Sequence, residues 1–171
     1  RYAPGTLPTT YFMDVDFPVD EAAGYAVGNR GVYLKTTDGG QNWTRPCVFD
    51  SLASLKAVRF AGSGETGFIA GFPSAQNGRV WRSTDGGANW DTVLVGPSGM
   101  PCDIEFPEGP DTGFVADHSR CVWRTTNGGD TWTRQGIVKN DQSNKKGQRH
   151  AGNYNHPGQE LAVAIPFADG D

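Results

Sequence analysis

Short segments in which hydrophobic and polar residues alternate recur along the chain. Their apolar positions are β-branched or aromatic, and the positions between them are charged or small. These segments are residues 14–18, 57–61 and 103–107. An alternation with a period of two places successive side chains on opposite faces of an extended backbone, so each segment is predicted to be a strand.

Three more strands are expected after each of these segments. Second strands are expected at 24–28, 67–71 and 113–117, where short apolar runs are bounded by turn residues. Third strands are expected at 32–36, 80–83 and 122–125, and fourth strands at 43–49, 90–95 and 132–138. Four consecutive strands joined by tight turns form an antiparallel meander.

A hairpin motif joins each third strand to the fourth. It contains a Ser or Thr, an Asp or Asn, a Gly-Gly pair and a Trp. Its residues are Thr36, Asp38, Gly40 and Trp43; Ser83, Asp85, Gly87 and Trp90; and Thr125, Asn127, Gly129 and Trp132. Glycine supplies the positive φ that such turns need, the Asp or Asn oxygen accepts backbone hydrogen bonds, and the Trp ring packs back on the hairpin. These residues are therefore expected to stabilise the fold.

The spacing of the motif predicts the architecture. Trp43 and Trp90 are 47 positions apart, and Trp90 and Trp132 are 42 apart, which matches one four-stranded propeller blade. We predict an all-β protein, a β-propeller of four-stranded antiparallel blades with three complete blades and the first strand of a fourth, in a partial or open ring. The expected divisions are 1–10 lead-in, 11–49 blade 1, 50–96 blade 2, 97–138 blade 3, 139–159 loop insertion and 160–171 first strand of blade 4.

The hairpin motif resembles the Asp-box, or BNR repeat, with the pattern Ser/Thr-x-Asp-x-Gly-x-x-Trp. Asp38 and Asp85 fit that pattern, and Asn127 replaces the Asp in the third copy. With the preceding Gly-aromatic strands, the chain looks most like the photosystem II stability/assembly factor family and its secreted bacterial relatives. Sialidases, sortilin-type receptors and xyloglucan-cleaving hydrolases share the box. The resemblance therefore implies a propeller and says little about chemistry.

Three blades and one strand are too few to close a propeller, which has roughly four to eight blades. We consider three explanations: a fragment of a longer propeller, a ring completed by other copies or by another chain, and an arc that is stable alone. In the second case the strand around Val163 could pair with the exposed sheet edge of a neighbour.

Composition narrows the function classes. The chain has 24 glycines and 11 prolines, as expected for a turn-rich β protein, and its net charge of −4 argues against nucleic acid as a partner. No apolar run is long enough for a membrane span. The first residue is Arg1, which a removed signal peptide would explain, so a secreted or periplasmic location is expected.

The cysteines and histidines suggest no metal site and no cofactor. Cys47, Cys102 and Cys121 are odd in number and lack C-x-x-C spacing. Cys102 and Cys121 fall in one repeat, so they are either bridged or small buried thiols.

One equivalent position on the first strands carries Asp16, Arg59 and Glu105. The resemblance implies that these strands are innermost, so the three side chains are expected to form an ion-pair ladder between blades. The alternative is a catalytic carboxylate pair, Asp16 with Glu105 or Asp14 with Asp103, acting as the acid and nucleophile of a glycosidase.

A second ladder of Lys35, Arg82 and Arg124 precedes the hairpins. Three cations converging on a carboxylate would suggest a sialidase. These positions repeat with the blade, however, so we expect them at equivalent places around the ring. Together with Arg59 and with Tyr154 in the loop insertion, they are the candidate binding residues.

Once the repeated residues are assigned to folding, no catalytic constellation remains. The leading hypothesis is a non-enzymatic extracellular or periplasmic module for protein binding, assembly or surface display, whose partner is a protein or other copies of itself. One alternative is a glycoside hydrolase acting on a glycan, with part of its site in missing blades and Asp16 and Glu105 involved. Another is a self-assembling structural subunit.

Overall fold

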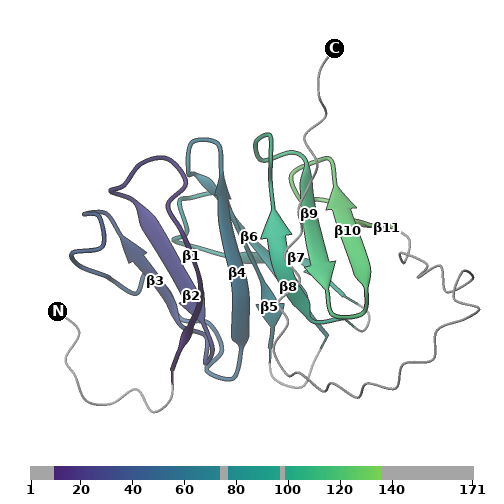
Figure 1. Ribbon diagram of the computed structural model, residues 1–171, viewed down its shortest axis with the longest axis horizontal. Coiled ribbons are helices and arrows are strands. Elements are labelled where there is room, and N and C mark those ends of the chain that lie inside the picture. Colours follow the sequence, from purple (N-terminus) through teal and green to yellow (C-terminus); the bar gives the residue numbers. More distant parts are fainter. Residues whose placement is uncertain (1–9, 74–76, 97–98, 136–171) are drawn as a thin grey trace, which may run out of the picture.

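The computed structural model describes residues 10–73, 77–96 and 99–135, which form eleven strands in three antiparallel sheets. The sheets stand side by side in chain order (Figure 1). The first contains β1 (Phe12–Asp16), β2 (Gly24–Gly28) and β3 (Tyr33–Thr36). The second contains β4 (Ser54–Ala61), β5 (Thr66–Phe72), β6 (Arg79–Ser83) and β7 (Asp91–Val95), and the third contains β8 (Pro101–Glu105), β9 (Gly113–Asp117), β10 (Cys121–Thr125) and β11 (Thr133–Gln135).

Each sheet is an antiparallel meander in sequence order, as the strand periodicity predicted. β1 packs beside β4, and β4 packs beside β8, so the first strands of successive sheets are neighbours. This is the arrangement of propeller blades, and it confirms the predicted all-β fold. No helix among the described residues is long and apolar enough to span a membrane. The predicted loop insertion and the predicted fourth-blade strand lie outside the described residues.

The first sheet differs from the predicted four-stranded blade. Instead of a strand at 43–49, it has a single bridge in which the Thr44 N–H donates to the Lys35 carbonyl at 2.8 Å. Pro46 has no N–H and so cannot continue the ladder. Phe49 then turns inward and packs its ring against Tyr33 and Trp81 between the first two sheets.

The buried core lies between the blades. Two aromatic pairs mark the interfaces: Tyr25 stacks on Phe60 with ring centroids 3.6 Å apart, and Phe68 stacks on Phe106 at 3.8 Å. In each pair a second-strand ring of one blade meets a ring at or just after the end of the first strand of the next blade. Aromatic pairs of this kind contribute about 0.5–1.5 kcal/mol beyond the area that they bury.

The Gly-Gly hairpins are closed by side-chain hydrogen bonds. In the second blade, Asp85 Oδ1 accepts from the Ser83 hydroxyl at 2.8 Å and from the Asn89 N–H at 2.9 Å. The Ser83 hydroxyl in turn accepts from the Gly87 N–H at 2.9 Å. The Trp90 indole N–H donates to the Gly87 carbonyl at 3.2 Å, which holds the ring over the turn.

The other two hairpins share this pattern of a hydroxyl and a side-chain oxygen. Asp38 Oδ1 accepts from the Asn42 N–H at 2.8 Å, and Asn127 Oδ1 accepts from the Thr131 N–H at 3.0 Å. The third hairpin therefore closes without a carboxylate, because the amide oxygen of Asn offers the same acceptor.

The second glycine of each hairpin has a positive φ, 81° at Gly40, 84° at Gly87 and 87° at Gly129. Gly87 also lies against the preceding blade, where the Tyr33 hydroxyl donates to its carbonyl at 3.0 Å. A Cβ at Gly87 would collide with that hydroxyl, whereas a Cβ at Gly40 would meet nothing closer than the Trp43 ring at 3.6 Å. The glycines thus share one backbone conformation but differ in what covers them.

Gly87→Ala is expected to destabilise the chain more than Gly40→Ala does. Both variants place an alanine at positive φ, at a cost of about 1–2 kcal/mol. Only Gly87→Ala also displaces a ring of the neighbouring blade, which adds about 1–3 kcal/mol. Equilibrium urea unfolding of the two variants measures the difference. Equal losses of stability would show that the packing of Tyr33 over the hairpin does not contribute to the free energy of unfolding.

Asp85→Asn is expected to flatten the acid dependence of stability. The Asn89 backbone and side-chain N–H groups and the Ser83 hydroxyl lower the pKa of Asp85 to about 2, from an ordinary 3.8. A carboxyl with a lowered folded-state pKa stabilises the fold above its unfolded pKa, and that contribution is lost as the pH falls toward the folded value. Between about pH 4 and pH 2, Asp85→Asn should therefore lose less stability than the parent chain.

Urea unfolding midpoints measured at a series of pH values test this expectation. The converse change, Asn127→Asp, introduces a carboxyl at the same place in the third hairpin and should steepen the acid dependence. If the midpoints of the parent and both variants changed with pH in parallel, the carboxyl of this hairpin would not contribute to the acid dependence of stability.

Candidate functional site

Arg59 on β4 links the first strands of all three blades. Its Nη1 lies 2.7 Å from Asp14 Oδ2 on β1, and its Nε lies 3.0 Å from Glu105 Oε1 on β8. All three side chains are partly exposed. An acid–base–acid ladder therefore crosses the blades, with one guanidinium held between two carboxylates, but it differs from the expected ladder in its first acid.

The first acid of the ladder is Asp14 and not Asp16. Asp16 Oδ2 instead accepts the Phe60 N–H at 2.7 Å, and Asp14 Oδ2 accepts the Val58 N–H at 3.0 Å as well as the guanidinium. Burial raises the pKa of Asp16, although the Phe60 hydrogen bond and the charge of Arg59 oppose the shift. Of the carboxylates considered as glycosidase pairs, Asp14, Asp16 and Glu105 thus bind groups of the neighbouring blade. Asp103 Oδ1 accepts the N–H of Ile104 on its own strand at 2.9 Å.

The third-strand cations also reach the next blade. Lys35 Nζ donates to the Gly86 carbonyl at 2.8 Å, and Arg82 Nη1 donates to the Gly128 carbonyl at 2.6 Å. Both carbonyls belong to the first glycine of the following hairpin. Arg82 Nη1 also lies 2.6 Å from Asp130 Oδ1. Lys35 and Arg82 therefore occupy equivalent places on successive blades, as their spacing predicted, and do not converge.

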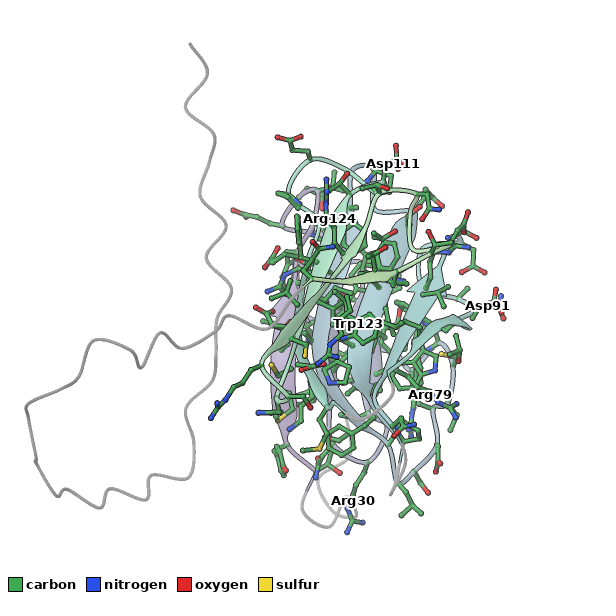
Figure 2. All side chains as sticks on the ribbon, turned by 90° about the vertical axis from the view of Figure 1, so that its right-hand side faces the viewer. Arg30, Arg79, Asp91, Asp111, Trp123 and Arg124 are labelled. Carbon is green, nitrogen blue, oxygen red and sulfur yellow. The ribbon has the colours of Figure 1, made fainter. Side chains whose placement is uncertain are left out.

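Arg124 is the third member of this series. Its guanidinium carbon lies 5.9 Å from the centre of the Phe114 ring, just as Lys35 Nζ lies 5.4 Å from the Tyr25 ring. The Arg124 side chain is exposed on the outer face of the third sheet (Figure 2). Tyr154, the remaining candidate binding residue, lies outside the described residues.

All three cysteines are free thiols. Cys102 on β8 and Cys121 on β10 are separated by β9, since β9 pairs with both strands. Two strand spacings of roughly 4.8 Å exceed the Cα separation that a disulfide spans, so the considered Cys102–Cys121 bridge does not form. Cys121 Sγ instead accepts from the Arg134 guanidinium, with Nη2 at 2.6 Å. Among the described residues, no cluster of three His, Cys, Asp or Glu side chains could hold a metal ion.

A groove of about 470 Å³ opens at the lower end of the first two blades. It forms because Asn29 pairs with Ser54 and the Gly31 N–H donates to the Ala53 carbonyl at 2.8 Å, which joins the β2–β3 turn to the start of β4. Its walls carry two cations and, besides Ala53, three larger apolar side chains. These are Arg30, Lys56, Tyr11, Leu52 and Phe72.

The two cations of this groove differ in their surroundings. Arg30 is exposed and has a φ of +57°, a conformation that non-glycine residues rarely adopt and that recurs at functional sites. Lys56 Nζ lies 5.7 Å from the centre of the Phe72 ring. Figure 2 shows Arg30 pointing away from the lower end of the sheets. The sequence patterns did not indicate this groove, because its residues come from turns and strand ends of two different repeats. The Arg30-Gly31 turn was the one available signal.

The comparisons with known proteins agree with this geometry. The family model described as photosynthesis system II assembly factor YCF48 matches residues 5–133. None of the curated proteins compared with the chain matches it.

Solved structures of the same family resemble the chain. A structure described as "YCF48 bound to D1 peptide" has 26% sequence identity and a TM-score of 0.63, over 74% of this chain and 41% of that one. YCF48 from Cyanidioschyzon merolae has 32% identity and a TM-score of 0.61, over 75% of this chain and 38% of the other. The chain thus spans about two fifths of the length of these relatives.

A more distant structure shares the fold alone. The GH74 enzyme from Niastella koreensis has 19% identity and a TM-score of 0.58, over 72% of this chain and 22% of that one. The family match, in contrast, covers most of the described blades. The chain belongs to the family of the photosynthesis system II assembly factor YCF48.

Proposed function

We propose that this chain is a non-enzymatic propeller module that binds a peptide segment of a protein partner and serves its assembly outside the cytoplasm. The observation that carries the proposal is the family match together with the structure of a relative, YCF48, bound to D1 peptide. The proposed location outside the cytoplasm rests on the secreted bacterial relatives of the family that the hairpin motif resembles.

The ladder residues support a binding role over a catalytic one. Arg59 forms ion pairs with Asp14 and Glu105, and Asp16 accepts a hydrogen bond from a backbone N–H of the neighbouring blade. A general acid or nucleophile must face substrate, whereas these carboxylates face protein groups. Their geometry holds the blades in register, which makes the stack a rigid platform for loops and turns.

The lower groove is the surface that suits a peptide. Its volume of about 470 Å³ accommodates a few side chains, and it combines apolar walls with two cations. Such a surface suits a segment that carries a carboxylate beside an apolar residue, because the cation pairs with the acid and the walls take the apolar group. Arg30 is the exposed cation, and the Lys56 ammonium lies over the Phe72 ring.

Arg30→Glu and Lys56→Glu are each expected to weaken peptide binding by about tenfold, because they replace attraction of a carboxylate by repulsion. Fluorescence anisotropy with labelled peptides tiled across the D1 sequence measures the affinity. Arg120→Glu is the matched control: Arg120 is exposed, has a φ of +62°, and lies in the corresponding β9–β10 turn of the third blade.

Binding that all three variants retain would place the peptide elsewhere on the propeller. If no D1 peptide binds the parent chain, the proposed partner class is wrong for this protein.

A further inference from the structure

The charges of the described blades are divided between the two ends of the molecule. At the upper end lie the Gly-Gly hairpins and the loops between the first and second strands (Figure 1). The acids in these hairpins and loops are Asp20, Glu21, Asp38, Glu65, Asp85, Glu108, Asp111 and Asp130. The cations that precede the hairpins, Lys35, Arg82 and Arg124, are fewer. The upper end is therefore acidic, and Figure 2 shows Asp111 on it.

The lower end carries the opposite charge. It consists of the turns between second and third strands, the connections between blades and the strand ends beside them (Figure 1). Its cations are Arg30, Arg45, Lys56, Arg79, Arg120 and Arg134. The guanidinium groups of Arg45 and Arg134 reach this end, since they donate to the Gly31 carbonyl and to Cys121 Sγ. All three blades thus contribute positive charge to one end.

Little negative charge offsets these cations. Among the described residues, the acids in or next to the lower turns and connections are Asp50 and Asp117. Asp117 is buried, and its carboxylate accepts the Cys121 N–H at 3.1 Å and the Trp123 indole N–H at 3.0 Å. Its charge is therefore directed into the third blade and away from the lower surface.

Two of the lower turns hold an arginine in the same unusual conformation. Arg30, between β2 and β3, has a φ of +57°, and Arg120, between β9 and β10, has a φ of +62°. Glycine suits this backbone region better, so an exposed arginine there indicates a use for its side chain. None of the ion pairs among the described residues involves either arginine. Both guanidinium groups are thus open to an external anion.

Apolar side chains stand beside these cations. Leu52, in the connection from the first blade to the second, is 67% exposed, and Met100, just before β8, is 44% exposed. Large apolar side chains next to arginines at the tips of turns give this end the amphipathic character of a surface that rests on a lipid bilayer.

We propose that the lower end of the blades docks on the surface of an anionic lipid bilayer. The guanidinium groups of Arg30 and Arg120 donate to lipid phosphate oxygens, and Leu52 and Met100 enter the boundary between headgroups and acyl chains. The acidic upper end is repelled by the same surface, so the molecule adopts one orientation on it.

A planar partner fits the spread of these cations better than a peptide does. The lower groove brings together only Arg30 and Lys56, whereas Arg120 and Arg134 lie on the third blade, outside its walls. A partner that meets the cations of all three blades at once has to be broad. A bilayer presents its phosphate charges over a plane, and the proposal does not depend on a peptide in the groove.

Cosedimentation of the full chain with vesicles tests the proposal. The chain should bind vesicles of equal parts phosphatidylglycerol and phosphatidylcholine, and it should stay in solution with phosphatidylcholine alone. Raising the salt concentration should weaken binding, because it screens the exposed charges. Arg30→Glu and Arg120→Glu should each reduce the affinity for the anionic vesicles by about tenfold or more. Leu52→Ser should also reduce it, with a loss that persists at high salt.

Arg124→Glu is the matched control, because it makes the same change of charge at an exposed site toward the upper end, and it should bind vesicles like the parent. Arg120→Glu separates this proposal from peptide binding, since it should retain the peptide and lose the vesicles. Equal binding to both kinds of vesicle, or equal weakening by Arg124→Glu, would overturn the proposal. Binding to soluble polyglutamate as tight as to vesicles, with no effect of Leu52→Ser, would instead assign the lower end to an acidic protein.

Discussion

The contact between one blade and the next is the interaction on which this structure depends. A single sheet of three or four strands has two apolar faces and buries neither alone. Here the faces meet through stacked rings, through a cation that reaches a hairpin carbonyl, and through Arg59 across the first strands. Each of these groups acts on a neighbour in the next repeat, so the strands hold together only as a stack.

The hairpins show how local and tertiary requirements coincide. The Gly-Gly pair permits the turn, and the absence of a side chain also lets the preceding blade approach the turn closely. The carbonyls of that pair then become acceptors for Lys35, Arg82 and Tyr33. A sequence element that looks like a turn signal is thus also the docking point for the neighbouring sheet.

Most of the fold could be predicted from the sequence because period-two alternation and the repeated hairpins are local signals. Among the described residues the strands follow the expected order, and only the fourth strand of the first sheet fails, since Pro46 ends its ladder after one bridge. The site was harder to predict. Asp14 and Asp16 lie on the same face of one strand, two residues apart, and the choice between them as partner of Arg59 depends on how adjacent blades are offset, which no local pattern encodes.

The stacking also determines what it costs to open a single sheet. Because each sheet contacts only its sequence neighbours, local stability approximates a sum over adjoining pairs, as in a one-dimensional chain of coupled units. The sheet of β4 to β7 has a neighbour on both sides, whereas the sheets of β1 and β8 each have one within the described chain. Opening the central sheet therefore breaks two described interfaces at once, so its amide hydrogens exchange only through that larger opening.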